Sequence, residues 1–204
     1  MYEGFESEIL SIFEPRTGDN VVDCGAHIGK YTILASKLVG KDGHVVAIEP
    51  SLENYEALLV NLKLNRCENV VPMNRAAWRE DEEVTLWVSQ STATHSLKQA
   101  WDQERALWPT NIRESVNVRG LRLDDLLKTM VRIDWLKLDV EGAESEVLQG
   151  STECIKKRKI LNIIVESGDE ASPDFLKSHD YLLTKVSTLR PYYYARPKNI
   201  QPER

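Results

Sequence analysis

The chain alternates short apolar runs with segments of helical periodicity, and this alternation restricts the folds that it can adopt. Apolar runs predict strands at 20–23 (NVVD), 44–50 (HVVAIEP), 134–139 (DWLKLD) and 159–166 (KILNIIVE). Helical patterns lie between them, at 31–38, 51–65 and 143–148. Strands joined by helices favour a parallel sheet with right-handed crossovers, and continuous apolar strands indicate burial on both faces. We therefore predict a doubly wound α/β fold with helices on both faces of the sheet.

The remaining segments complete this scheme. Residues 69–78 (NVVPMNRAAW) predict a third strand, and Ser51 is placed to cap a helix whose expected buried stripe is Leu52, Tyr55, Leu59 and Leu62. Residues 79–120 break the alternation, with strands expected at 83–88 and 115–121, and a short helix capped by Asp124 follows. Residues 181–187 and 192–195 predict a closing antiparallel hairpin. We expect one domain over 1–204, a mostly parallel seven-stranded sheet, and an inserted excursion at 79–120 that shapes an acceptor site.

Composition narrows the class of partner. The formal net charge of −6 gives no overall attraction to nucleic acid or to acidic membranes. Three separated cysteines match no metal-ligand spacing and favour reduced thiols. The first ten residues, MYEGFESEIL, lack the basic and apolar parts of a signal peptide, and no apolar run is long enough to cross a bilayer. These features predict a cytoplasmic protein with no membrane partner.

The segment VVDCGAHIGKYT, at 21–32, ends a buried strand on Asp23 and opens into Gly25 and Gly29. In open parallel sheets, ligands bind outside the carboxyl ends of the strands. Glycines there let the backbone approach a ligand closely. Glu49, which ends the next strand, can accept two hydrogen bonds from a ribose diol. The alternative is that these glycines only make turns and that the carboxylates only cap helices.

The same loop departs from two known nucleotide motifs. G-x-G-x-x-G would need glycine where His27 stands, and the Walker pattern would need Gly-Lys-Ser/Thr where the chain has Gly29-Lys30-Tyr31. A carboxylate at the strand end is unfavourable beside a pyrophosphate, but it suits a ligand with an ammonium and a sulfonium group. Charge therefore favours S-adenosyl-L-methionine over a dinucleotide.

A second motif, WLKLDVEGAESEVLQG at 135–150, places Asp139, Glu141, Glu144 and Glu146 around a strand-to-helix junction at Gly142. The helix dipole accounts for Glu144 and Glu146. It does not account for Asp139, which ends a buried strand on the ligand side. Together with VVAIEPSLENYEALLVNLKLN and LRLDDLL, this segment closely resembles the FkbM-type family of S-adenosylmethionine-dependent methyltransferases. The resemblance runs from about Gly18 to Glu166 and weakens over 79–115.

The resemblance implies a class I methyltransferase fold, which is Rossmann-like, and O-methylation of sugars or other small hydroxylated metabolites. It also implies a set of residues that line the cofactor: Asp23, Gly25, Ala26, His27, Gly29, Glu49, Pro50, Asn74, Ala76, Ala77 and Asp139. In this set Glu49 would hold the ribose, and Asn74 and the two alanines would lie at the adenine edge. His27 departs from the family, which usually has Asn there, and the part before the first strand is short.

A hydroxyl acceptor must lose its proton to a base or bind a metal. The candidate catalytic carboxylates are Asp139, Glu141 and Glu166, with Asp139 first, although it could equally hold the cofactor's ammonium group. The same oxygens could bind Mg²⁺, but nothing in the spacing fixes a coordination number and we assign no metal site. His95 could reach the acceptor, although a single loop histidine is more often solvated, and Trp101 and Trp108 could stack on it.

Two other functions stay open. Asp139, Glu166 and Lys156, Lys157 and Lys159 loosely resemble the Lys-Asp-Lys-Glu arrangement of RNA 2′-O-methyltransferases, and STLRPYYYARPK interleaves cations with aromatic residues. The other alternative is a module that binds an adenosyl ligand without catalysis. A homodimer through the edge of the hairpin is a further option.

Overall fold

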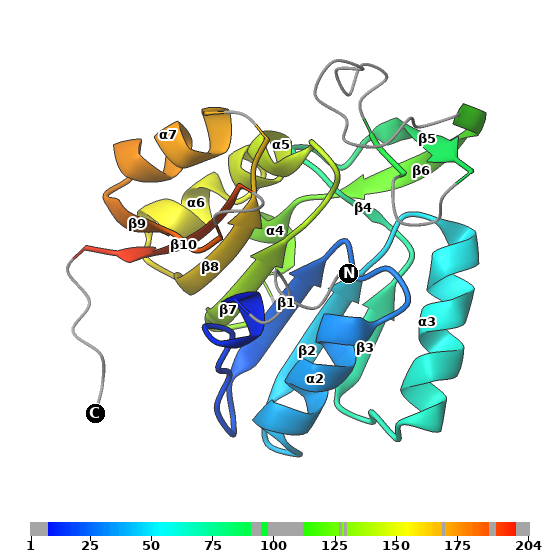
Figure 1. The fold of residues 1–204 in the computed structure, drawn as a ribbon, viewed down its shortest axis with the longest axis horizontal. Helices are drawn as coiled ribbons and strands as arrows, with labels where there is room; N and C mark the ends of the chain where they lie inside the picture. Colours follow the sequence, from blue (N-terminus) through cyan, green and yellow to red (C-terminus); the bar gives the residue numbers. More distant parts are fainter. Residues whose placement is uncertain are drawn as a thin grey trace.

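The protein is described here from a computed structural model, which covers residues 8–90, 95–97, 112–126, 128, 130–168, 170–187 and 191–198. Its centre is a seven-stranded sheet in the order β3-β2-β1-β7-β8-β10-β9 (Figure 1). The strands are β1 (Asn20–Cys24), β2 (His44–Ile48), β3 (Val70–Met73), β7 (Ile133–Leu138), β8 (Ile160–Glu166), β9 (Tyr181–Lys185) and β10 (Tyr192–Pro197). The first five in the sheet are parallel, and β10 runs antiparallel to both β8 and β9. The predicted sheet and its antiparallel C-terminal hairpin are confirmed.

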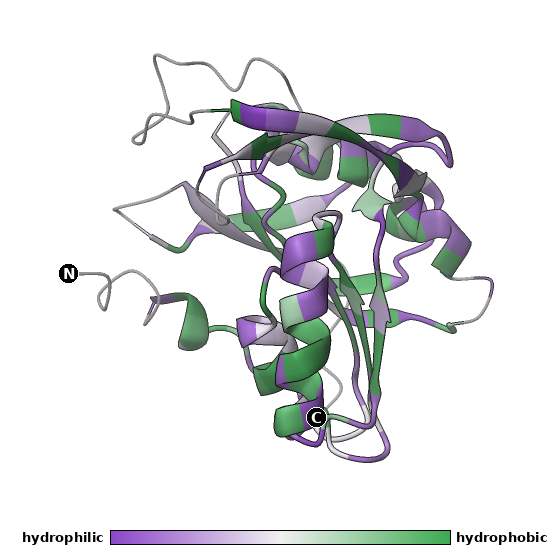
Figure 2. Cartoon of the chain, turned by 90° about the vertical axis from the view of Figure 1, so that its right-hand side faces the viewer, coloured by the Kyte–Doolittle hydropathy of each residue, from purple (hydrophilic) through white to green (hydrophobic). Residues whose placement is uncertain are grey.

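Helices cover both faces of this sheet because adjacent strand residues point into opposite cores. Val21 packs in one cluster with α2 (Lys30–Val39), which shares its side of the sheet with α3 (Leu52–Leu64). Val22 packs in another cluster with the helices of the opposite face. Those helices are α4 (Leu123–Leu126), α5 (Glu144–Gln149), α6 (Thr152–Lys156) and α7 (Ala171–Ser178). The central strands are accordingly mainly green in Figure 2. Burial on both faces explains their continuous apolar sequence.

The predicted buried stripe of α3 is confirmed for Leu62 and in part for Tyr55, and it is wrong for Leu52 and Leu59. Leu52 and Leu59 are 60% and 40% exposed, whereas Leu58 and Leu62 are buried. Asn54 is also buried, and its side-chain amide lies 3.5 Å from the Glu49 carboxylate. Residues four apart share a helix face, so Asn54, Leu58 and Leu62 all lie on the buried face of α3. Ser51 caps the helix as expected.

A smaller sheet occupies the region of the predicted excursion. It contains β4 (Ala76–Ala77), β6 (Ile112–Leu121) and β5 (Glu83–Ser89), in that order, with β5 and β6 antiparallel. In Figure 1 the β5–β6 ribbon lies at the upper right, beyond the carboxyl ends of the large sheet. The two strands expected at 83–88 and 115–121 are therefore present, and the second begins earlier. Trp101 and Trp108 lie outside the described residues.

Asp124 caps a different helix from the one predicted. It lies inside α4, and its carboxylate accepts hydrogen bonds from the backbone N–H groups of Glu153 (3.2 Å) and Cys154 (2.9 Å) at the start of α6. A residue inside one short helix thus satisfies the free donors of the next.

The three cysteines are buried and free. Within the described part of the chain, no helix has the length and apolar character that a membrane span requires.

Candidate functional site

Four carboxylates meet at the carboxyl edge of the large sheet, where the sequence places the ends of four strands. Asp23 lies near the end of β1, Glu49 follows β2, Asp139 follows β7 and Glu166 ends β8. Because β2, β1, β7 and β8 are parallel neighbours, their carboxyl ends lie along one edge. The structure therefore brings together residues that are distant in the sequence.

The loop after β1 is shaped by backbone conformation. Gly25, His27 and Gly29 have φ values of 77°, 51° and 97°, and the N–H of Gly25 donates to the Ile48 carbonyl (3.0 Å). A Cβ at Gly25 would stand 1.8 Å from the Asp139 carbonyl oxygen. A Cβ at Gly29 would stand 2.6 Å from the side chain of Leu58. The structure thus explains both glycines by close contact with protein atoms, whereas the sequence prediction explained them by room for a ligand.

Glu49 connects this loop to α3. Its buried carboxylate accepts hydrogen bonds from the backbone N–H groups of His27 (2.8 Å) and Ser51 (2.9 Å). Burial raises the pKa of Glu49, and these backbone donors oppose that rise. The predicted ribose contact stays a prediction, but the carboxylate already has a structural role, since it fixes the turn between β2 and α3.

The residues expected at the adenine edge also contact protein. The Asn74 amide donates to the carbonyls of Glu49 (2.9 Å) and Pro50 (3.0 Å), so it supports the same turn. Ala76 and Ala77 are buried in β4, where they pair with β6. Strand pairing thus accounts for these two alanines in the structure, and their contact with adenine stays a prediction.

Lys137 is a central residue of the site that the sequence reasoning missed. Its ammonium lies 3.4 Å from Asp23 Oδ1 and 3.4 Å from Asp139 Oδ2, with the side chain only 4% exposed. It also lies over the Tyr31 ring, 5.1 Å from the centroid. Burial acts to lower the pKa of Lys137, but the attraction of Asp139 and Asp23 raises it above its ordinary value. The available signal was a lysine in the middle of the apolar strand 133–138.

Tyr192 is the second missed residue. Its hydroxyl lies 3.0 Å from Asp139 Oδ2 and 3.0 Å from Glu166 Oε2, so it can donate to either carboxylate. Burial acts to raise the pKa of Asp139, but Lys137 and the hydrogen bonds with Glu166 and Tyr192 outweigh it and hold that pKa below its ordinary value. Sequence alone did not show which aromatic residue of 192–194 faces the site, because this depends on the antiparallel register with β8.

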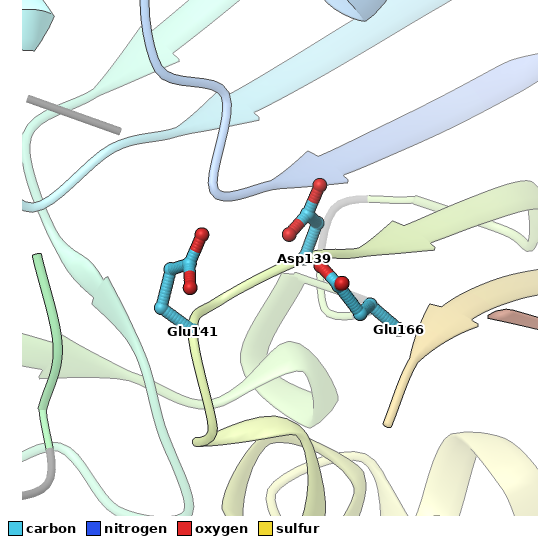
Figure 3. A group of neighbouring side chains, drawn as sticks. All are labelled: Asp139, Glu141 and Glu166. Atoms are coloured by element: carbon cyan, nitrogen blue, oxygen red, sulfur yellow. The ribbon is translucent and has the colours of Figure 1, made fainter. Parts of the chain in front are cut away.

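The candidate catalytic carboxylates Asp139, Glu141 and Glu166 do come together. Each offers an oxygen, and these oxygens lie within 4.8 Å of one another (Figure 3). The cluster has the hard oxygen ligands that Mg²⁺ prefers. However, Asp139 Oδ2 already forms an ion pair with Lys137 and accepts a hydrogen bond from Tyr192, which weakens it as a ligand for a cation.

Glu144 holds the corner of this motif. Its carboxylate accepts from the N–H groups of Val140 (3.0 Å) and Gly142 (3.2 Å), and burial raises its pKa to about 7. The helix dipole, which the sequence analysis invoked, is therefore only part of the reason for an acid at this position.

His95 is buried, with an exposed fraction of 8%, and is not a solvated loop residue. The adjacent Ser96 hydroxyl donates to the Glu141 carbonyl (2.9 Å), so this part of the excursion contacts the second motif. The basic run at 156–159 lies elsewhere. It precedes β8, whose far end bears Glu166, and the exposed Lys156 and Lys157 pair with Glu153.

Comparison with known proteins gives consistent matches. Residues 23–189 match the family described as the methyltransferase FkbM domain. Methyltransferase 1 of Beauveria bassiana (strain ARSEF 2860) is 27% identical over 143 residues, which cover 64% of this chain and 57% of that protein. The structure of methyltransferase FkbM from Methylobacillus flagellatus KT superposes with a TM-score of 0.62 at 17% identity, covering 91% of this chain and 45% of that one.

A more distant structure shares the fold. Fibrillarin of Aeropyrum pernix, solved with natively bound S-adenosyl-L-methionine, superposes with a TM-score of 0.50 at 13% identity, covering 88% of this chain and 66% of that one. At these identities the solved structures show the fold alone, which is that of class I methyltransferases. The chain spans about half the length of the FkbM protein and of the Beauveria protein, 45% and 57% respectively.

Proposed function

The chain belongs to the FkbM methyltransferase family, and on this premise we propose that it transfers the methyl group of S-adenosyl-L-methionine to a hydroxyl oxygen of a small metabolite such as a sugar. The observation that carries the proposal is the network of charged and polar side chains at the carboxyl edge, in which Lys137 and Asp23 are buried and Asp139 and Glu166 are partly exposed. Lys137 joins Asp23 to Asp139, and Tyr192 joins Asp139 to Glu166. This network lies beside the loop at 25–29, since Gly25 faces the Asp139 backbone.

The charges at this edge fit a cationic ligand. The Lys137 ammonium contacts the carboxylates of Asp23 and Asp139, and Tyr192 connects a third carboxylate, that of Glu166, to Asp139. A site with more acidic than basic groups attracts the ammonium and sulfonium of the cofactor and disfavours a pyrophosphate. The bound cofactor supplies an electrophilic methyl group on its sulfonium.

The residues then divide the remaining work. The loop 25–29 and the Glu49 turn hold the adenosyl part. Asp139 orients the ammonium group, because a carboxylate whose pKa is held low is a weak base and a good partner for a cation. Glu166, in its ionised form, takes the proton of the acceptor hydroxyl, and the Tyr192 hydroxyl keeps its carboxylate in position beside Asp139. This assignment changes the order of the sequence prediction, which put Asp139 first as the base.

Two substitutions separate these roles. We expect Asp139→Asn to weaken cofactor binding by about tenfold, since a charged partner is lost. Glu166→Gln should reduce kcat by about 10²–10⁴-fold and leave cofactor affinity nearly unchanged, since a general base is lost. Calorimetric titration and steady-state kinetics measure the two effects. Equal losses of both in each variant would contradict the division of roles.

Incubation with methyl-labelled cofactor tests the acceptor class. Extracts of small metabolites, total RNA and total protein are supplied separately, and we expect the label in the small-metabolite fraction. This label should be stable to alkali if a hydroxyl has been methylated, whereas a methyl ester would lose it. Label in RNA alone would support the alternative that this chain is an RNA 2′-O-methyltransferase. The chain shares its fold with fibrillarin. Binding without any transfer would support the non-catalytic module. Activity that disappears with EDTA would assign a cation to Asp139, Glu141 and Glu166.

A further inference from the structure

His95 is held in one orientation by the β5–β6 ribbon. The N–H of Ser89, the last residue of β5, donates to His95 Nδ1 (3.1 Å). Ser96, which follows His95 in the chain, pairs with Trp87 through two backbone hydrogen bonds of 2.8 Å and 3.1 Å. The imidazole is therefore fixed both by its own ring nitrogen and by the backbone that carries it.

This geometry determines which ring nitrogen carries the hydrogen. Nδ1 accepts a hydrogen bond, so it presents a lone pair, and the neutral ring must carry its hydrogen on Nε2. Burial lowers the pKa of His95 and favours that neutral form. Nε2 is buried and makes no hydrogen bond to any residue that the structure describes. A buried donor without an acceptor is costly and indicates a missing partner.

Two contacts bring the segment that carries His95, and the neighbouring β6, next to the proposed cofactor site. On one side, the Ser96 hydroxyl binds the carbonyl of Glu141, in the motif that follows Asp139. On the other side, Arg113 in β6 lies 3.5 Å from Glu53, in the first turn of α3 just after the Glu49 turn. His27 and Glu53 are also close enough to influence the pKa of His95, although burial has the larger effect. His95 thus lies near both His27, in the loop at 25–29, and Glu53, at the start of α3.

We propose that His95 completes the cofactor site, with its Nε2–H donating a hydrogen bond to an oxygen or ring nitrogen of the adenosyl group of S-adenosylmethionine. This inference rests on the proposed function. It gives the 79–120 excursion a role in binding the cofactor, in addition to the role in the acceptor site that its sequence predicts.

Calorimetric titration of His95→Phe tests the proposal. Phenylalanine keeps the ring volume and removes the donor, so the Kd for both S-adenosylmethionine and S-adenosylhomocysteine should rise roughly three- to tenfold, by the same factor, because both contain the adenosyl group. His95→Gln, which keeps an N–H donor, should lie closer to the wild type. His44→Gln, an exposed histidine at the start of β2, is the matched control and should bind as the wild type does.

Histidine-selective ¹⁵N NMR on the wild type gives a readout that does not depend on the folding of a variant. His27→Asn, His44→Gln and His179→Gln assign the His95 signals by elimination. On saturation with S-adenosylmethionine, the Nε2 resonance should shift and its hydrogen should exchange more slowly with water. An unchanged Nε2 resonance, or a His95→Phe variant with the wild-type Kd, would overturn the proposal. A wild type that binds no cofactor would instead overturn the proposed function itself.

Discussion

Lys137 is the residue that lets several carboxylates coexist at the edge of the sheet. Its ammonium is buried and lies between the buried Asp23 and Asp139, whose side chain is 24% exposed. Without it, Asp23 would be buried with no compensating charge, which is strongly unfavourable, and Asp139 would lose its ion pair. Thr32 donates to the other oxygen of Asp23 (2.7 Å) but contributes no charge. Lys137 is therefore needed first for the stability of the fold, whatever it contributes to ligand binding.

Replacing Lys137 by methionine should destabilise the fold by about 3–5 kcal/mol, because it leaves the buried Asp23 carboxylate without a compensating charge. Urea unfolding measures the change. The control is Lys128→Met, which removes an exposed ion pair with Asp125 and should cost at most about 0.5 kcal/mol. A Lys137 variant as stable as that control would show that the buried pairs contribute little.

Glu144 should make stability depend on pH. Its pKa is about 7 in the folded protein against 4.5 for an ordinary Glu, so between these values the folded state binds more protons than the unfolded state. The contribution of Glu144 to stability should thus be greatest at about pH 4.5 and below, fall as the pH rises through about 7, and then level off. The total fall should be on the order of 3 kcal/mol.

The measurement compares urea unfolding at several pH values for the wild type and Glu144→Gln. The difference in unfolding free energy between the wild type and Glu144→Gln should fall as the pH rises from 4.5 to about 7, because the other titratable groups are common to both proteins. Glu146→Gln, in the same helix, is the control. A constant difference between the wild type and Glu144→Gln across this pH range would contradict the raised pKa.

At the scale of elements, the site depends on how closely the loop after β1 approaches the end of β7. Gly25 has φ 77° and its missing Cβ would overlap the Asp139 carbonyl, so Gly25→Ala combines backbone strain with a clash against main chain. Gly18 has φ 88° but nothing within 4 Å of the same position. Gly18→Ala therefore measures the strain alone.

We expect Gly18→Ala to cost about 1 kcal/mol and Gly25→Ala at least about 3 kcal/mol, with loss of cofactor binding only in the second. Thermal and urea unfolding give the two values. If both variants lose the same stability, the close approach of the loop to β7 is not what requires glycine at position 25.

Sequence alone was sufficient for most elements of the sheet. Strand-end residues such as Asp23, Glu49, Asp139 and Glu166 could be placed along one edge because parallel strands end together. It was not sufficient for contacts that depend on packing. Leu58 rather than Leu59 faces the core, on the same side of α3 as Asn54, which contacts Glu49, and Asp124 caps α6 across a tertiary contact. Tyr192 joins the site through the strand register, which no local pattern encodes, whereas Lys137 had a local signal, a lysine within an apolar strand.

At the scale of the whole molecule, the methyltransferase family and fold are consistent with a ligand site at the carboxyl edge of the large sheet. The large sheet supplies the acidic network, and the β5–β6 ribbon lies beyond that edge (Figure 1). A ligand bound there would contact the loop at 25–29 on one side and the ribbon on the other. The central claim is that this space holds S-adenosylmethionine.

A crystal structure of the chain grown with S-adenosylhomocysteine tests this claim most directly. We predict that the adenosyl group lies between the loop at 25–29 and the Glu49 turn, with the amino acid part toward Asp139. Density for the ligand at another surface, or its absence from crystals at saturating concentration, would contradict the claim.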